Sequence, residues 1–161
     1  MAEENFTLTT FYAEWKNYQE RMKASLAPLT AEQLTLRAAP GLRSVGENAA
    51  HIIGCRAGWF NYTLGEDASA YGSATTDWNA PGHTAAQLVQ GLDDTWRFMS
   101  DCLARWSDDD MRKLFDDDWD GEIVHLSRAW IVWHVMEHDL HHGGELSLTL
   151  GMHGIPAQFP G

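Results

Sequence analysis

The 161-residue chain is 44% hydrophobic, and its 11 Lys and Arg against 23 Asp and Glu give a formal net charge of −12. This length predicts a single domain over residues 1–161 with a real core, and the acidic charge argues against nucleic acid and anionic membrane surfaces as partners. Two cysteines, Cys55 and Cys102, allow one disulfide at most and lack the spacing of a thiolate zinc site, so we expect a cytoplasmic protein.

Apolar residues at helical spacing predict a first helix from about Thr7 to Ser25, ended by Pro28. Its apolar stripe is formed by Phe11, Trp15, Tyr18 and Met22. A short helical turn is expected after Thr30, because Thr30 and Gln33 have the spacing of a capping box. The first part of the chain therefore predicts one long amphipathic helix followed by a short one.

Three more long helices are predicted downstream. The second begins at Ser44, whose partner Glu47 completes a capping box, and continues to about Leu64. A loop rich in small residues spans Glu66–His83, and a third helix follows from Thr84 to about Trp106. The fourth runs from about Ser127 to Met152. Four long amphipathic helices predict an all-α four-helix bundle, and none holds the roughly 18 uninterrupted apolar residues of a membrane span.

An acidic stretch separates the third and fourth helices. The run Asp108–Asp110 is interpreted as a solvated loop. Residues 116–123 match part of an EF-hand calcium loop, but the twelfth position of that loop lacks the bidentate Glu that closes the cage. The pair Asp120-Gly121 is instead typical of a two-residue turn between short strands over Lys113–Trp119 and Glu122–Leu126. We therefore expect a short hairpin before the last helix.

Candidate chemistry concentrates on the fourth helix, where four of the eight histidines fall within residues 134–142. At about 100° of rotation per residue, His134, His138 and His142 project from one face, together with Glu145. Apolar residues share that face, so it must point into the bundle, where imidazoles need hydrogen-bond partners or a metal ion. Two imidazoles at positions i and i+4 of one helix can bind the same divalent ion.

A third ligand should come from another helix that faces the same cavity. His51 on the second long helix is the best candidate, because the other histidines lie in a loop, beside the hairpin and at the chain end: His83, His125 and His153. Three imidazoles accept zinc, nickel, iron, manganese or cobalt. The sequence therefore predicts a divalent-metal site between the second and fourth long helices.

Two segments and the hairpin together resemble a known family. The segments are Ser44-Val-Gly-Glu-Asn-Ala-Ala-His51 on the second helix and His134-Val-Met-Glu-His-Asp-Leu-His-His-Gly-Gly-Glu145 on the fourth. In order and spacing they are similar to the DinB/YfiT-like metalloprotein superfamily, and the similarity covers nearly the whole chain. The resemblance implies a four-helix bundle with an up-down-down-up connection, which the long loop Glu66–His83 could supply.

The resemblance also implies a site and an activity. It assigns His51, His138 and His142 as ligands of a divalent metal ion, and the characterised members of the family include transferases and isomerases that use small cellular thiols. We therefore expect a metal-dependent enzyme, foremost a thiol transferase, that activates a low-molecular-weight thiol or water to attack a small electrophilic substrate. Glu145 or His134 would accept a proton or orient a ligand imidazole.

The opposite face of the fourth helix carries a second apolar stripe that includes Trp133 and Leu140. This stripe must be covered, either by the chain's own loops and helices or by a second copy of the chain. Dimers are common in the family, so the resemblance implies a homodimer contact through Trp133 and Leu140.

Two other functions remain open from the sequence. His134-Val-Met-Glu-His138 matches the H-x-x-E-H pattern of inverted zinc peptidases. A non-catalytic metal-binding or purely structural bundle is the other alternative, because fold and ligands do not establish turnover. Mutation of His51 distinguishes the peptidase from the bundle site, because the three-histidine site of the bundle requires His51 and the peptidase pattern does not.

Overall fold

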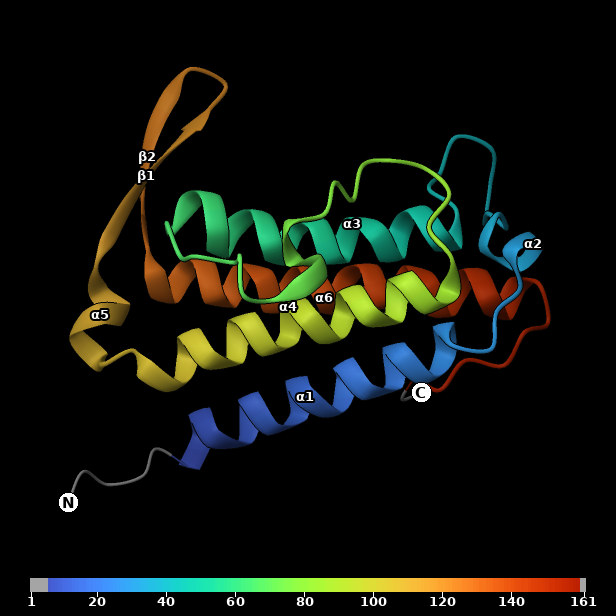
Figure 1. Cartoon of the computed structure of the whole chain (residues 1–161), viewed down its shortest axis with the longest axis horizontal. Coiled ribbons are helices and arrows are strands. Elements are labelled where there is room, and N and C mark those ends of the chain that lie inside the picture. Colours follow the sequence, from blue (N-terminus) through green and yellow to red (C-terminus); the bar gives the residue numbers. More distant parts are fainter. Residues whose placement is uncertain (1–5, 160–161) are drawn as a thin grey trace.

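The computed structural model describes residues 6–159, with side chains from residue 9 onward. Its long helices are α1 (Phe6–Leu26), α3 (Val45–Ala57), α4 (Ala85–Arg105) and α6 (Arg128–Met152). They lie side by side, with α1 and α6 running in one direction and α3 and α4 in the other (Figure 1). α3 and α1 each pack against both α4 and α6. The mostly helical fold expected from the sequence is confirmed, and no helix in this range is long and apolar enough to cross a membrane.

Shorter elements connect the long helices. α2 (Ala31–Leu34) follows the Thr30 capping box, and α5 (Asp108–Arg112) follows α4. The strands β1 (Leu114–Trp119) and β2 (Glu122–Ser127) pair antiparallel and project as a ribbon from one end of the molecule (Figure 1). The turn between them, Asp120-Gly121, has positive φ angles of 56° and 89°, as a tight hairpin turn requires. The predicted hairpin is confirmed.

Three local predictions need correction. The second long helix does not stay α-helical to its end, because residues 58–63 form the π-helical element η1, in which the N–H of Leu64 donates to the carbonyl of Trp59 (3.0 Å). The loop Glu66–His83 contains a short 3₁₀ helix, η2 (Gly72–Thr75). The run Asp108–Asp110 is the first turn of α5 rather than a loop, because its N-cap Ser107 forms a reciprocal capping box and acidic residues stabilise a helix N-terminus.

Buried apolar side chains of the long helices and their connections form the core in two clusters. The cluster around the first half of α3 includes Met22, Ile52, Ile53, Leu88, Leu92 and Leu146. The cluster nearer the hairpin includes Trp15, Phe60, Phe98, Met99, Ile131 and Val135. Phe11, which the sequence placed on the inward stripe of α1, is 55% exposed, because it borders a groove between α1 and α6 instead of facing the core.

A fully buried ion pair joins α3 to α6. Arg56 donates to both carboxylate oxygens of Asp139, with an Nη2–Oδ2 distance of 2.7 Å and an Nε–Oδ1 distance of 3.0 Å. From α1, the indole of Trp15 donates to Asp139 (2.7 Å) and the amide oxygen of Gln19 accepts from Arg56 (2.8 Å). A buried charge is tolerated only when it is paired. These four side chains, the ion-pair layer, therefore fix how α1, α3 and α6 face one another.

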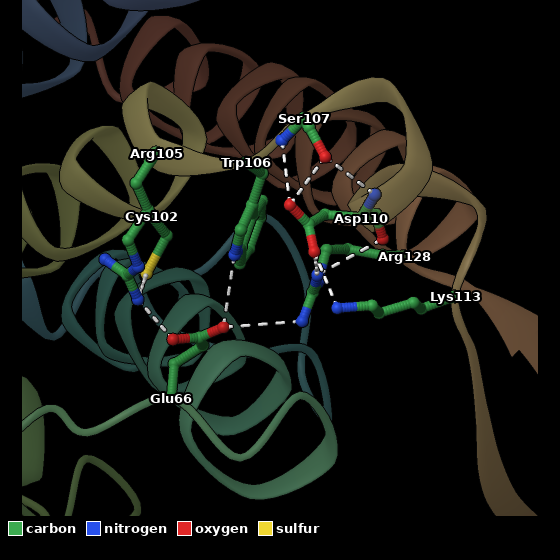
Figure 2. A network of polar contacts seen from close by, with 8 residues as sticks. All are labelled: Glu66, Cys102, Arg105, Trp106, Ser107, Asp110, Lys113 and Arg128. Carbon is green, nitrogen blue, oxygen red and sulfur yellow. Dashed lines mark hydrogen bonds and ion pairs between the residues drawn. The ribbon is translucent and has the colours of Figure 1, made fainter.

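A second polar network lies at the end of the molecule that carries the hairpin (Figure 2). Glu66, which follows η1, accepts hydrogen bonds from the guanidinium of Arg105 and from the indole of Trp106 (3.2 Å). Arg128 approaches the same carboxylate at 3.5 Å and lies over the ring of Trp106, 4.4 Å from its centroid. Arg128 also donates to the carbonyl of Asp110 (3.2 Å). The network thus ties the ends of η1, α4 and α5 to the start of α6.

Candidate metal centre

Three histidines converge where α3 packs against α6. His51 lies in the second turn of α3, and His138 and His142 are one turn apart on α6. The Nε2 atoms of His51 and His138 are 3.0 Å apart, and one ring nitrogen from each of the three lies within 4.8 Å of the others. The structure therefore brings together the three residues that the sequence selected as ligands. We call them the histidine layer.

Hydrogen bonds on the outer side of His142 fix the direction of its ring. The carboxylate of Glu145 accepts from Nδ1 of His142 at 2.6 Å. Asn48, on α3, donates to the same carboxylate (3.2 Å) and to the carbonyl of His142 (3.2 Å). Because Nδ1 then carries the proton, Nε2 of His142 keeps its lone pair available. Glu145 thus orients a candidate ligand, as a carboxylate does for many metal-bound imidazoles.

Burial favours the neutral forms of His51 and His138. It lowers the pKa of His51 to about 4 and the pKa of His138 to about 3, with smaller contributions from neighbouring imidazoles and from Arg43. Burial alone would raise the pKa of Glu145, but hydrogen bonds from His142 and Asn48 outweigh it and lower that pKa. At neutral pH, His51 and His138 are therefore neutral and Glu145 is ionised, which are the protonation states that metal binding requires of these groups.

The donor arrangement fits a divalent ion. Two nitrogens that bind one ion at about 2.0–2.1 Å, with an angle of about 90–110° between them, lie about 2.9–3.4 Å apart. The 3.0 Å between the Nε2 atoms of His51 and His138 falls within this range. Nδ1 of His138 is buried without a hydrogen-bond partner among the described residues. One nitrogen from each of three imidazoles is a donor set that zinc, nickel, iron or manganese accepts, so such an ion could be held there.

Two cavities adjoin the histidine layer, and His51 lines both. The larger cavity, about 670 Å³, lies between α2, the start of α3 and residues 78–84. The smaller cavity, about 320 Å³, lies between the second half of α3 with the start of η1 and residues 74–79. Small molecules can therefore approach the layer along this face of α3.

Trp78 forms a wall that the two cavities share. Its ring packs on Gly91 of α4 so closely that a Cβ there would lie 2.4 Å from it, so the position admits only glycine. The indole N–H donates to the carbonyl of Ser73 (3.1 Å), and Ser73 binds the buried carboxylate of Asp94 through its N–H (2.8 Å) and its hydroxyl (2.6 Å). The loop that covers the site is thereby held on α4.

His134 lies apart from the triad. Its ring stacks on Trp130, with centroids 5.0 Å apart and planes 9° from parallel, and meets the edge of Trp59 at 5.1 Å. Its Nδ1 lies 3.4 Å from Glu137. In the part of the chain that the structure describes, His138 groups with His51 and His142 and not with His134. The ring centroids of His134 and His138 are 6.2 Å apart, and within the described residues no group of three possible metal ligands includes His134.

The three histidines that lie on neither α3 nor α6 are not part of the histidine layer. His83 packs against Trp78 with ring centroids 4.6 Å apart and planes tilted by 43°, at the border of the larger cavity. His125 pairs with Asp116 on the exposed hairpin (2.6 Å), and Nε2 of His153 is 2.9 Å from the carbonyl of Arg37. These positions agree with the selection of His51 as the third candidate ligand.

Sequence reasoning missed Asn48 and Trp78. Asn48 precedes His51 by three positions and therefore shares its side of α3, so a polar amide on the buried face of a helix was a usable signal. Trp78 gave no such signal, because its role depends on Gly91 of α4, which reaches it only in the folded chain.

The sequence model of the DinB family matches residues 1–157. The chain belongs to the DinB family. A solved DinB-like protein from Bacillus cereus ATCC 10987 is 21% identical to this DinB-family protein, with 94% of each chain covered and a TM-score of 0.73. A solved conserved protein from Enterococcus faecalis is 15% identical, with 93% of this chain and 99% of that chain covered and a TM-score of 0.59. Both similarities establish the DinB-like fold. No curated protein matches the chain significantly.

Proposed function

We propose that this DinB-family protein is a divalent-metal-dependent enzyme, foremost a transferase that joins a small thiol to a small electrophilic substrate. Isomerase and hydrolase reactions are variants of the same chemistry. His51, His138 and His142 would hold the ion. The observation that carries the proposal is the convergence of three imidazole nitrogens beside two cavities. When bound, a divalent ion lowers the pKa of a coordinated thiol or water toward neutrality.

The number of protein ligands favours a catalytic site over a structural one. Structural zinc sites use four protein ligands, whereas catalytic sites use three and keep a position for water or substrate. His51 lines both cavities, so space for a small molecule adjoins the triad directly. The alternative, a non-catalytic metal-binding or structural bundle, has no need of such space.

The chain's own thiols are poor nucleophiles. Burial, with a further contribution from Asp139, raises the pKa of Cys55 to about 12, although this cysteine lines the smaller cavity. Burial also raises the pKa of Cys102 to about 11. Both thiols stay protonated at neutral pH, and the thiolate is the reactive form. A thiol-transfer reaction at this site would therefore take its sulfur from a separate small molecule.

The two candidate acid–base residues differ in what they contact. Glu145 binds the ligand imidazole of His142, so we assign it as a positioning residue. His134 contacts no member of the triad through a hydrogen bond, and its ring centroid lies 6.2 Å from that of His138. Its side chain is 27% exposed. We assign His134 as the candidate proton acceptor, with Trp59 and Trp130 holding its ring.

Cobalt substitution tests the proposed function. Cobalt-loaded protein is titrated with 2-mercaptoethanol, cysteine or glutathione, and the absorption spectrum is followed for a sulfur–metal charge-transfer band. A band is expected in the wild type and is expected to be lost in His51→Ala, with helicity retained in circular dichroism. If no thiol changes the wild-type spectrum and the bound ion resists exchange for hours, the closed structural site is the better account.

We also propose an up-down-down-up four-helix bundle and a homodimer. The antiparallel pairing of α1 and α6 against α3 and α4 supports the bundle topology (Figure 1). Trp133 is 55% exposed, and Leu140, which lines the groove between α1 and α6, is 47% exposed; this exposure supports a second copy as the cover of this face. Light scattering on wild type and Leu140→Asp is the test: a dimer that the substitution dissociates is expected, whereas a monomeric wild type contradicts the assignment.

A further inference from the structure

The larger cavity beside the histidine layer has one unbalanced positive charge. Its charged lining residues are Arg37, Arg43 and Glu47. Arg37 and Glu47 form an ion pair with nitrogen–oxygen distances of 2.7 Å, so their charges offset each other. Arg43 has neither a hydrogen-bond nor an ion-pair partner within residues 6–159.

A free guanidinium at this place is unusual for so acidic a chain. Among the described residues, every Lys and Arg except Lys16, Arg21 and Arg43 pairs with a carboxylate. Of these three, Arg43 alone lines a cavity that also contains His51. The chain has 23 Asp and Glu side chains, but none of those that the structure describes pairs with Arg43. The guanidinium beside the candidate centre is therefore available to a bound ligand.

Capping boxes bind two of the N–H groups at each helix N-terminus that borders this cavity, which leaves fewer donors for an anion. At the start of α3, the N–H groups of Ser44 and Glu47 are bound within the capping box. At the start of α4, those of Thr84 and Gln87 are bound in the same way. A phosphate prefers several free donors, as at an uncapped helix N-terminus or phosphate-binding loop. A single guanidinium instead matches one carboxylate, which it can bind with two parallel hydrogen bonds.

The separation of Arg43 from His51 bears on the length of the ligand. Arg43 lies two residues before the start of α3, and His51 lies six residues after its first residue, Val45, which corresponds to about 9 Å along the helix axis at a rise of 1.5 Å per residue. A molecule that contacts both ends must therefore be extended. Its carboxylate must be separated by several bonds from the atom that approaches the histidine layer.

We propose that the larger cavity is the subsite for the carboxylate tail of the thiol co-substrate and that Arg43 binds that carboxylate. This inference rests on the proposed function, because it assigns the sulfur end of the same molecule to the histidine layer. The inference specifies the class of the co-substrate, which is a small thiol with a carboxylate several bonds from sulfur. The net charge of the chain gives no indication of this preference, which is a property of the local cavity.

The test uses two thiols with the same six-carbon chain, one ending in a charged carboxylate and the other in a neutral hydroxyl group. Cobalt-loaded wild type is titrated with 6-mercaptohexanoate and with 6-mercaptohexanol, and the charge-transfer band reports binding of each. The carboxylate thiol is expected to bind about tenfold more tightly, as for one charge-assisted hydrogen-bonded pair. This preference should shrink as salt is raised, because Arg43 is exposed.

Arg43→Gln should remove the preference and leave binding of 6-mercaptohexanol unchanged. The control is Arg112→Gln on α5, an exposed arginine paired with Asp109, which should keep the preference. If both thiols give the band with equal affinity in the wild type, the subsite is wrong and the proposed function stands. If neither gives it, both proposals fall.

Discussion

Two polar layers cross the core of this protein between the same two helices, and they differ in charge and in their access to the cavities. In the ion-pair layer, Asp139 accepts from Arg56 and Trp15, and Arg56 also donates to Gln19, with both charged side chains 0% exposed. In the histidine layer, two Nε2 atoms face each other at 3.0 Å, and Nδ1 of His138 has no partner among the described residues.

The difference separates a structural role from a functional one. His138 and Asp139 are neighbours in sequence, yet about 100° of helix rotation sends them into different layers. In the ion-pair layer the two opposite charges neutralise each other within the chain, although Nε2 of Gln19 has no partner among the described residues, so that layer serves packing. The histidine layer borders two cavities and brings together one ring nitrogen from each of three imidazoles, so it is the layer that can take an ion and a small molecule.

The largest expected effect comes from opening the ion-pair layer. Asp139→Ala leaves the guanidinium of Arg56 buried without its counter-charge, so we expect the free energy of unfolding to fall by about 3–5 kcal/mol. Urea denaturation followed by circular dichroism measures this. Asp109→Ala, which removes one partner of an exposed ion pair on α5, is the control and should leave stability unchanged within error. An equally small effect of Asp139→Ala would mean that the layer does not hold the helices together.

The histidine layer should respond to metal, which the ion-pair layer cannot do. Zinc at about 100 times its dissociation constant should stabilise the wild type by about 2.7 kcal/mol, because only the folded state presents the site. His138→Ala should lose this metal-dependent rise in Tm. His125→Ala, on the exposed hairpin, should retain it. Equal zinc stabilisation of wild type and His138→Ala would place the binding site elsewhere.

The contact between Glu145 and His142 predicts a smaller effect on the same site. Glu145→Ala removes the acceptor of the Nδ1 proton, so we expect metal affinity to fall about 10–100-fold. Glu145→Gln retains an oxygen at this place and should lose less. Competition with a chelator measures the affinities. His141→Ala is the matched control, since His141 lies on the exposed side of Glu145 (3.3 Å), and a loss as large as that of Glu145→Ala would contradict the assigned orientation.

The acidic hairpin, unlike the histidine layer, is expected to show no stabilisation by a metal ion. Its residues form paired strands around a tight turn and not a calcium cage, so calcium should leave Tm unchanged within error. A saturable rise of Tm with calcium would revive the EF-hand interpretation.

Much of the fold was predictable because its signals are local. Capping boxes such as Ser44 with Glu47 and Thr84 with Gln87 mark helix starts within four residues, and the structure contains both. The two histidines of α6 were predictable as a pair because their spacing is that of one helical turn. His51 needed only the further assumption that its helix faces theirs.

The ion-pair layer and the cavity wall were not predictable in this way. Arg56 meets Asp139 from 83 positions away in sequence, and a charged residue in a helix is ordinarily exposed, so neither signals a buried pair. The contact of Trp78 with Gly91 likewise depends on how a loop lies on α4. The free guanidinium of Arg43 is visible only once the partners of the other cations are known.

Metal content per chain shows directly whether the histidine layer holds an ion. Protein purified without a histidine tag is loaded with zinc, freed of excess ion and analysed by mass spectrometry, alongside His51→Ala. The account predicts about one ion per wild-type chain and almost none in His51→Ala, which should keep its helical circular dichroism because apolar packing supplies most of its stability. A wild type that retains no ion, or a His51→Ala variant that retains a full complement, would contradict the account.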